Sequence, residues 1–244
     1  MSSGELRVCS YNIHKGLSTS NRRFLLEDMR HAIRLTDTDL VFLQEVVGHG
    51  LGYKEEALSD PASQFEFLAD EVWPHYAYGK NAVVDDGHHG NAILSKFPIT
   101  SWQNFDVSRW NFSQRGVLYG RLDNGIKLLC VHFGLLGRER RYQLRRLREV
   151  INEISDPREP LIMAGDFNDW RLVCDKYLRR QLGFEEVMTT LNGRVARTFP
   201  AILPVMRMDR IYFRNMELLD GGLLSGWPWK RLSDHSALTA VFRL

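Results

Sequence analysis

The 244-residue sequence is poor in cysteine: it has three, and they stand far apart at Cys9, Cys130 and Cys174. No Cys-x-x-Cys pair occurs, which argues against a structural zinc site. Cys9 and Cys130 fall inside apolar stretches that are typical of strands, so we expect small core side chains there. A chain of this length can bury a core that needs no disulfide to hold it.

The sequence also lacks long hydrophobic runs. Its first residues, Met-Ser-Ser-Gly-Glu-Leu-Arg, contain no apolar signal core. No apolar run approaches the roughly 20 residues needed to span a bilayer. These absences, together with the few cysteines, lead us to expect a cytoplasmic protein with no transmembrane segment.

Neither sign of charge is in large excess. The chain has 32 Lys and Arg against 30 Asp and Glu, a formal net charge of +2. That balance argues against a protein coated in basic charge for nonspecific duplex binding. A local basic patch or a metal ion could still attract a phosphate, so the balance leaves nucleic acid open as a partner. The 44% hydrophobic and 25% charged residues are ordinary for a globular protein.

Short apolar runs alternate with amphipathic segments along the whole length, without an internal repeat or a linker. We therefore expect one domain over residues 1–244. The strands predicted from these runs are Leu6–Tyr11, Asp39–Val46, Asn91–Ser95, Val117–Leu122, Ile126–His132, Leu161–Gly165, Asp209–Arg214 and Ser236–Arg243. The turn Asp123-Asn124-Gly125 predicts a hairpin between two of them.

Helical spacing recurs in four segments. The first predicted helix carries Leu26, Met29 and Ile33 on one face, and the second, which starts at Asp60-Pro61, carries Phe65, Leu68, Ala69 and Val72. The third, Arg138–Ile154, has the stripe Leu144, Leu147, Ile151 and Ile154. The fourth is short and ends near Leu182, before Gly183. Strands outnumber helices, and hairpins mix with helical crossovers. This pattern favours an α/β fold in which mixed sheets pack on each other with helices outside.

Polar residues follow the ends of the predicted strands several times over. They are Asn12, Glu45, His132, Asp166, Asn168, Asp209, Asp234 and His235. Carboxylate and amide oxygens suit Mg²⁺ or Mn²⁺. Carboxylates that lie close together also repel one another, so such a site needs a cation or protons. A divalent ion beside a carboxylate and a histidine is suited to phosphoryl transfer.

Seven short motifs occur in a fixed order between residues 10 and 236. They are Ser10-Tyr11-Asn12-Ile13, Leu43-Gln44-Glu45-Val46, Gly90-Asn91-Ala92-Ile93-Leu94-Ser95, Val131-His132-Phe133, Ala164-Gly165-Asp166-Phe167-Asn168, Met208-Asp209-Arg210-Ile211-Tyr212 and Leu232-Ser233-Asp234-His235-Ser236. In these motifs the chain resembles the endonuclease/exonuclease/phosphatase superfamily, which includes DNase I-like nucleases, abasic-site endonucleases, sphingomyelinases and inositol polyphosphate phosphatases. The resemblance implies a four-layer α/β sandwich of two facing mixed β-sheets, with the active site at one end.

The resemblance also implies roles for individual residues. Glu45 would be the principal metal ligand, with Asn12 beside it and Asp234 as a further metal-side carboxylate. Asp166 would orient or deprotonate the attacking water. The groups that would face the phosphate are Asn168, His132, Arg115 and His235, the last paired with Asp209.

Some positions depart from the family pattern. His14 stands where relatives carry an acidic residue, which argues against a second metal ion there. Abasic-site endonucleases usually have Tyr-x-Pro-Asn where this chain has Val131-His132-Phe133-Gly134. The sequence around His132 is closer to the DNase I-like and sphingomyelinase-like branches. His88 and His89 are expected in a solvated loop.

The substrate stays open at this level. A basic run includes Arg138, Arg140, Arg141, Arg145, Arg146 and Arg148, which would form a solvated helix face or a contact to nucleic acid or anionic lipid. Trp227-Pro228-Trp229 could stack on bases, sit at a lipid interface or pack in the core. The loop Ala201–Val205 would form a rim or lid of the site. The segment Asp169-Trp170 would shape the rim or pack inside the protein.

The resulting prediction is a monomeric phosphodiesterase that uses Mg²⁺ or Mn²⁺, with a DNase-like endonuclease or exonuclease as the leading interpretation and DNA favoured over RNA. The first alternative is an enzyme that acts on phospholipid, sphingomyelin or another phosphate ester. The second is a catalytically silent binding module of the same fold, which the intact set Glu45, Asp166, Asp209 and His235 argues against.

Overall fold

The computed structural model describes residues 4–20, 23–50, 63–84 and 87–244. Twelve strands run through these residues: β1 (Glu5–Asn12), β2 (Leu40–Gly50), β3 (His75–Val84), β4 (Gly87–Ser95), β5 (Ile99–Asp106), β6 (Gly116–Leu122), β7 (Lys127–His132), β8 (Leu161–Asp166), β9 (Glu185–Glu186), β10 (Asp209–Arg214), β11 (Leu218–Leu224) and β12 (Ala237–Arg243). The helices are η1 (His14–Gly16, a 3₁₀ turn), α1 (Leu26–Arg34), α2 (Gln64–Ala69), α3 (Gly137–Ile154), α4 (Val173–Gln181), α5 (Val187–Asn192) and α6 (Trp229–Leu232).

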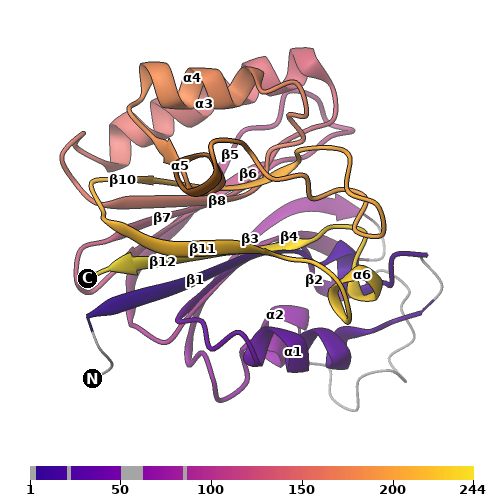
Figure 1. Cartoon of the computed structure of the whole chain (residues 1–244). Helices are drawn as coiled ribbons and strands as arrows, with labels where there is room; N and C mark the ends of the chain where they lie inside the picture. The colour runs from indigo at the N-terminus through magenta and orange to yellow at the C-terminus, as the bar shows by residue number, and fades with distance from the viewer. Residues whose placement is uncertain (1–3, 21–22, 51–62, 85–86) are drawn as a thin grey trace.

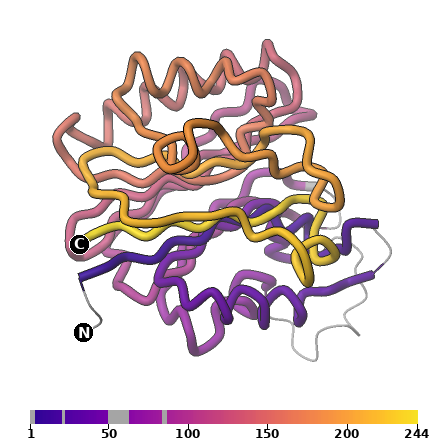
Figure 2. Tube along the Cα trace, in the orientation of Figure 1, coloured from indigo at the N-terminus to yellow at the C-terminus, as the bar shows by residue number. Residues whose placement is uncertain are grey.

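The strands form two mixed sheets of six strands each. The first has the order β11-β12-β1-β2-β4-β3 and the second β5-β6-β7-β8-β10-β9. Each sheet has one parallel pair, β1 with β2 and β7 with β8, inside an otherwise antiparallel arrangement. Figure 2 shows the two ends of the chain meeting in the first sheet, where β1 lies beside β12.

Three apolar clusters separate four layers. The first cluster lies between the sheets and takes side chains from both, among them Phe42 and Leu128. The second, with Met29 and Trp73, lies between the first sheet and helices α1, α2 and α6. The third, with Leu147 and Leu178, lies between the second sheet and helices α3 and α4. Figure 1 shows α3 and α4 on the outer face of the second sheet and α1 and α2 on that of the first, whereas α5 lies at the edge between the sheets. The predicted α/β four-layer sandwich is therefore confirmed.

Most predicted elements are present. The strand predicted at Asp39–Val46 continues to Gly50 as β2. The stripe of α3 is buried at Leu144, Leu147 and Ile151, and Gly183 follows α4 with φ +68°. Asp60 and Pro61 lie outside the described residues; in the described part, α2 begins at Gln64 behind Ser63, whose side chain caps it.

The sequence analysis missed β3, β5, β9 and β11, and the short helices α5 and α6. It was also wrong about His88 and His89, which lie on strand β4 and not in a solvated loop. The alternation in β5 is weak because most of its side chains are exposed or half-buried. Among the described residues, no helix is long and apolar enough to cross a membrane.

A buried ion pair fixes the segment that follows β8. Arg210 is fully buried; its guanidinium donates to the Asp169 backbone carbonyl at 2.6 Å and lies 3.5 Å from the Asp169 carboxylate. The same carboxylate accepts from the backbone N–H groups of Val173, Cys174 and Asp175 at the start of α4. Of the two alternatives left open for Asp169, the structure selects packing: this residue is a buried link between β10 and α4.

We expect Asp169→Ala to lower the free energy of unfolding by about 3 kcal/mol or more, because it leaves the Arg210 charge buried without its partner. Urea unfolding followed by circular dichroism measures the loss. The control is Asp37→Ala, which removes exposed ion pairs to Arg7 and Lys96. It should change stability by about 1 kcal/mol at most. Equal effects of the two substitutions would contradict the assigned role of Asp169.

Candidate active site

The strand ends that carry the predicted site residues meet at one end of the sandwich. β7 ends at His132 and β8 at Asp166, and these two residues are partners in the parallel register. β10 begins at Asp209, opposite Asp166 on the antiparallel side. β1 ends at Asn12 in the facing sheet. The Asn12 amide bridges the two sheets, because its Nδ2 donates to Asp166 Oδ2 at 3.3 Å.

Backbone geometry brings two of the carboxylates into place. Glu45 has φ +57° at an irregularity of β2, between Leu43 and Val46, where the pairing with β4 shifts register. Such a bulge re-aims a side chain. Gly165 has φ +145°, and a Cβ there would lie 1.9 Å from the Val131 carbonyl oxygen. Only glycine therefore fits immediately before Asp166.

Asp166 lies at the centre of the cluster. Its carboxylate accepts from the Asn168 backbone N–H at 2.8 Å and from Asn168 Nδ2 at 3.2 Å. Asn12 Nδ2 also donates to Glu45 Oε1 at 3.3 Å. The nearest ring nitrogens, His132 Nε2 and His235 Nε2, lie 3.7 and 3.8 Å from Asp166 Oδ2.

Asp209 and His235 form a buried pair. His235 Nδ1 lies 2.9 Å from Asp209 Oδ2. The Thr198 hydroxyl holds the Asp209 backbone, accepting from its N–H at 3.1 Å. The Ser233 hydroxyl accepts from the His235 N–H at 3.2 Å and donates to the Asn12 carbonyl at 2.7 Å. This serine thereby ties the loop before β12 to the end of β1.

The two histidines differ in charge. Burial alone would lower the pKa of His235, but the Asp209 carboxylate outweighs burial and raises that pKa to about 10. Burial, followed by the nearby charge of Arg115, lowers the pKa of His132 to about 3. At neutral pH the site therefore holds one imidazolium and one neutral imidazole.

The carboxylates differ as well. Burial raises the pKa of Asp166 to about 7; the Asp209 charge adds to the rise and the His235 charge opposes it. Burial would also raise the pKa of Glu45, but the facing charges of His132, which is protonated at such low pH, and Lys15 bring it to about 2. Asp166 is thus the carboxyl group whose pKa lies nearest neutral pH.

The remaining predicted residues border the same cluster. Asn168, at φ +50°, donates through Nδ2 to the Phe133 carbonyl at 2.9 Å. Arg115 is half-buried directly before β6 and lies close enough to lower the pKa of His132. Asp234 is the least enclosed, and its Oδ1 lies 3.3 Å from His14 Nδ1. The structure therefore gathers all nine predicted residues at one end of the sandwich.

Sequence reasoning missed several neighbours of the site. Lys15 Nζ lies 4.0 Å from Glu45 Oε2. His89 on β4 is close enough for Lys15, Glu45 and Arg115 to influence its pKa, which burial lowers to about 4. Lys15 follows the Asn12 motif at φ +57°. Its closeness to Asn12 in sequence is the one signal that could have marked it.

The donor set fits a hard divalent ion. Carboxylate oxygens of Glu45, Asp166 and Asp209 gather there without cysteine, and carboxylate oxygen is a ligand that Mg²⁺ or Mn²⁺ prefers. Asp209 Oδ1 is buried and has no hydrogen-bond partner within the described residues. Donor atoms of Asp166, Asp209 and His235 lie within 4.8 Å of one another. The unsatisfied oxygen and the crowded carboxylates both favour a bound cation.

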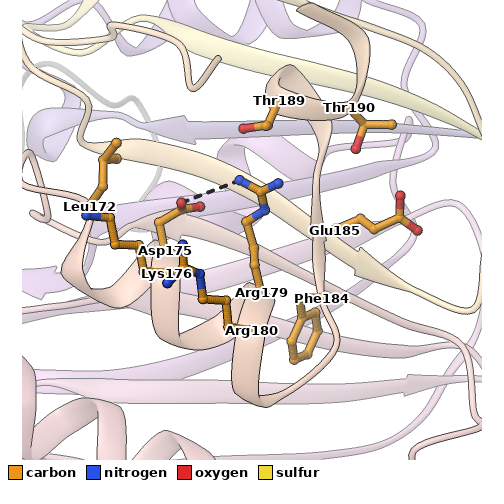
Figure 3. A pocket seen from close by; sticks show the side chains of 9 residues that line it. All are labelled: Leu172, Asp175, Lys176, Arg179, Arg180, Phe184, Glu185, Thr189 and Thr190. Atoms are coloured by element: carbon orange, nitrogen blue, oxygen red, sulfur yellow. Dashed lines mark ion pairs between the residues drawn. The ribbon is translucent and has the colours of Figure 1, made fainter. Parts of the chain in front are cut away.

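A separate cavity of about 520 Å³ lies beside α4 (Figure 3) and is lined by none of the predicted site residues. Its walls include Lys176, Arg179, Arg180 and Glu185. Arg179 pairs with Asp175 at 3.8 Å, as the dashed line shows. Acidic side chains in this cavity thus offset the charge of its basic ones. The cavity lining contains no cluster of carboxylates and histidines like the one around Asp166.

Known proteins confirm the family. The sequence profile of the Endonuclease/Exonuclease/phosphatase family matches residues 9–235. The chain belongs to this family. The superfamily comprises phosphodiesterases, nucleases and phosphatases, and is generally hydrolytic and dependent on a divalent metal.

Two relatives cover the chain almost completely. YbhP of Escherichia coli K12 is 44% identical over 244 residues, covering 98% of this chain and 96% of YbhP. UPF0294 protein VP2298 of Vibrio parahaemolyticus is 25% identical over 251 residues, covering 99% of this chain and 79% of the relative.

Solved structures of the family share the fold. A family member from Beutenbergia cavernae superimposes with a TM-score of 0.78 at 18% identity, covering 99% of this chain and 72% of the other. TDP2 of D. rerio, complexed with a single-strand DNA product, superimposes with a TM-score of 0.71 at 17% identity, covering 99% of this chain and all of TDP2. At these identities the likeness shows the fold alone.

We expect Gly165→Ala to lower the free energy of unfolding by roughly 2 kcal/mol more than Gly183→Ala, because only the first meets a backbone oxygen. Gly183 also has a positive φ, but a Cβ there meets nothing within 4 Å. Thermal and urea unfolding of both variants provide the comparison. Equal losses of stability would show that close approach to Val131 does not constrain Gly165.

Proposed function

We propose that the chain hydrolyses phosphodiester bonds with the help of a divalent metal ion. One observation carries this proposal: three carboxylates, Glu45, Asp166 and Asp209, converge at one end of the sandwich beside an imidazolium, His235. Such a cluster is costly to bury unless a cation or charged substrate contact offsets it. The profile match over residues 9–235 supports residues 1–244 as a single catalytic domain.

We assign the ion to Glu45 and Asn12, with Asp234 as a further carboxylate on the same side. When bound, Mg²⁺ or Mn²⁺ supplies positive charge to the phosphate oxygens. The group formed by Asp166, Asp209 and His235 is less suitable, because His235 carries a positive charge and its Nδ1 already pairs with Asp209 Oδ2, although Asp209 Oδ1 stays free to face a cation.

The chain's own residues perform the proton transfer and position the phosphate. Asp166 accepts a proton from the attacking water, for which a pKa near the working pH is well suited. Asn168 fixes Asp166 through two hydrogen bonds, and its amide lies beside the phosphate. His235, charged through Asp209, stabilises the negative charge that builds on the phosphate oxygens. Arg115 adds positive charge, while neutral His132 can donate or accept one hydrogen bond.

DNA is the first substrate candidate, and the TDP2 structure with a single-strand DNA product supports it. A phospholipid headgroup is the second candidate, supported by exposed aliphatic side chains in the loops around the site, such as Ile202 and Leu203. Because the TDP2 likeness carries the fold alone, the choice between the esters depends on the loops of this chain.

The reaction is tested with plasmid DNA, RNA, sphingomyelin, phosphatidyl lipids and a soluble ester, bis(p-nitrophenyl) phosphate. We expect turnover of at least one ester with Mg²⁺ or Mn²⁺, abolished by EDTA and restored by adding back the ion. Absence of metal-dependent turnover across the whole panel would assign the chain to a silent binding module. Turnover that survives EDTA would contradict the metal assignment.

Asp166→Asn and His235→Ala should each lower kcat by about 100-fold or more, because each removes a group that acts on the reacting atoms. Both variants should remain folded, as near-native circular dichroism would show. The matched controls Asp123→Asn, in an exposed hairpin, and His31→Ala, on the exposed face of α1, should retain full activity. Near-normal turnover in either site variant would refute the assigned site.

A further inference from the structure

Large apolar side chains crowd the end of the molecule that carries the site. We define the rim as five segments, residues 107–115, 133–141, 167–172, 193–208 and 225–236. Six apolar side chains in the rim are between 54% and 79% exposed: Phe112, Leu135, Leu136, Ile202, Leu203 and Trp227. Exposed apolar groups gathered around a site mark an interaction surface, whereas scattered ones do not.

Chain connectivity places these segments together. Leu135 follows His132 by three residues, and residues 107–115 lead into β6, where Val117 pairs with Val131. The backbone N–H of Ala201, next to Ile202, donates to the Asp234 carbonyl at 2.7 Å. In Figure 1 the loop before β10 and helix α6 both lie at the right-hand end of the molecule. The apolar tips therefore surround the site from several sides.

The rim is also strongly basic. Its five segments contain eleven Lys and Arg residues but three acidic ones. Of these three, Glu139 and Asp169 are buried, and Asp234 belongs to the site. Of the eleven basic residues, Arg140 is buried, which leaves ten. Two rim arginines stack on rim tryptophans: the Arg140 guanidinium lies 4.8 Å from the Trp170 ring centre, and Arg231 lies 5.6 Å from that of Trp227. The partner of this surface is therefore anionic.

The shape of the apolar side chains distinguishes two anionic partners. Nucleic-acid bases stack on flat rings, which Phe112 and Trp227 offer. Four of the six exposed side chains are branched aliphatics, which provide no stacking plane. Aliphatic and tryptophan side chains beside Lys and Arg are the composition of protein surfaces that enter the interface of an anionic bilayer.

We propose that the rim docks on an anionic lipid bilayer, with Ile202, Leu203 and Trp227 entering the interfacial layer and the rim arginines contacting lipid phosphates. Docking would present the cluster around Asp166 to phosphodiesters of lipid headgroups. Hydrolysis of the docked lipid rests on the proposed function. The inference deepens that function by naming membrane lipid as the substrate class.

Docking is measured without metal, so that it is separate from turnover. The protein is sedimented in EDTA with vesicles of phosphatidylcholine, with and without phosphatidylglycerol. We expect binding to the anionic vesicles and its loss at high salt. The double variant Ile202→Asn, Leu203→Asn should bind about tenfold more weakly or worse, because two apolar side chains no longer leave water.

Leu244→Asn is the matched control: Leu244 is 51% exposed and follows β12 at the end of that strand opposite to His235, away from the rim. Its vesicle binding should equal that of the wild type. All variants are also assayed for metal-dependent hydrolysis of bis(p-nitrophenyl) phosphate, which tests the proposed function alone.

Three results would overturn the proposal: no sedimentation with anionic vesicles, equal binding by wild type and double variant, or an equal loss in Leu244→Asn. Binding of a single-stranded oligonucleotide without binding to vesicles would also overturn it, and would assign the rim to nucleic acid. A protein that docks but hydrolyses no ester would leave the docking surface established and the proposed function refuted.

Discussion

Repulsion among buried carboxylates is the constraint that organises this molecule. Asp166 and Asp209 are cross-strand partners, so β-pairing itself brings their charges together. The Asn12 amide then links Asp166 to Glu45 of the other sheet. The fold offsets this crowding with the His235 charge and with amide donors, but burial and then the Asp209 charge still hold the pKa of Asp166 above its usual range. A cluster held in this state attracts a cation because the protein alone does not neutralise it.

The two sheets stay in register behind the cluster through a few buried polar contacts. Asn91 of β4 donates to the backbone carbonyls of Gly116 and Cys130 in the second sheet, at 3.1 and 3.2 Å. Gln44 Nε2 lies 3.3 Å from Cys130 Sγ. A buried polar group without a hydrogen-bond partner destabilises the fold. These contacts therefore select one relative position of the two sheets. They explain why two amides of the sequence motifs, Asn91 and Gln44, lie in the core and not at the site.

The sequence predicted what depends on local pattern and missed what depends on distant neighbours. The strands ending at Asn12, His132 and Asp166 were predictable because apolar runs ending in polar residues are visible in one dimension. β5 was missed because one exposed edge strand gives little alternation, and His89 was misplaced because β4 continues beyond its apolar run. The different protonation states of His132 and His235 were also out of reach, since they depend on burial and on Arg115 and Asp209, which are distant in sequence.

The net charge of +2 likewise does not reveal how the charged residues are distributed over the fold. Eleven of the 32 Lys and Arg residues lie in the five rim segments, which leaves 21 in the rest of the chain against 27 acidic residues. The near-neutral total therefore combines a basic end with an acidic remainder. Such a separation of charge orients the molecule as it approaches an anionic surface, whether a bilayer or nucleic acid. The basic rim then faces that surface. Orientation of this kind acts before any contact forms and weakens with salt. The charge distribution thus favours a productive approach, whereas the aliphatic rim decides which surface is held.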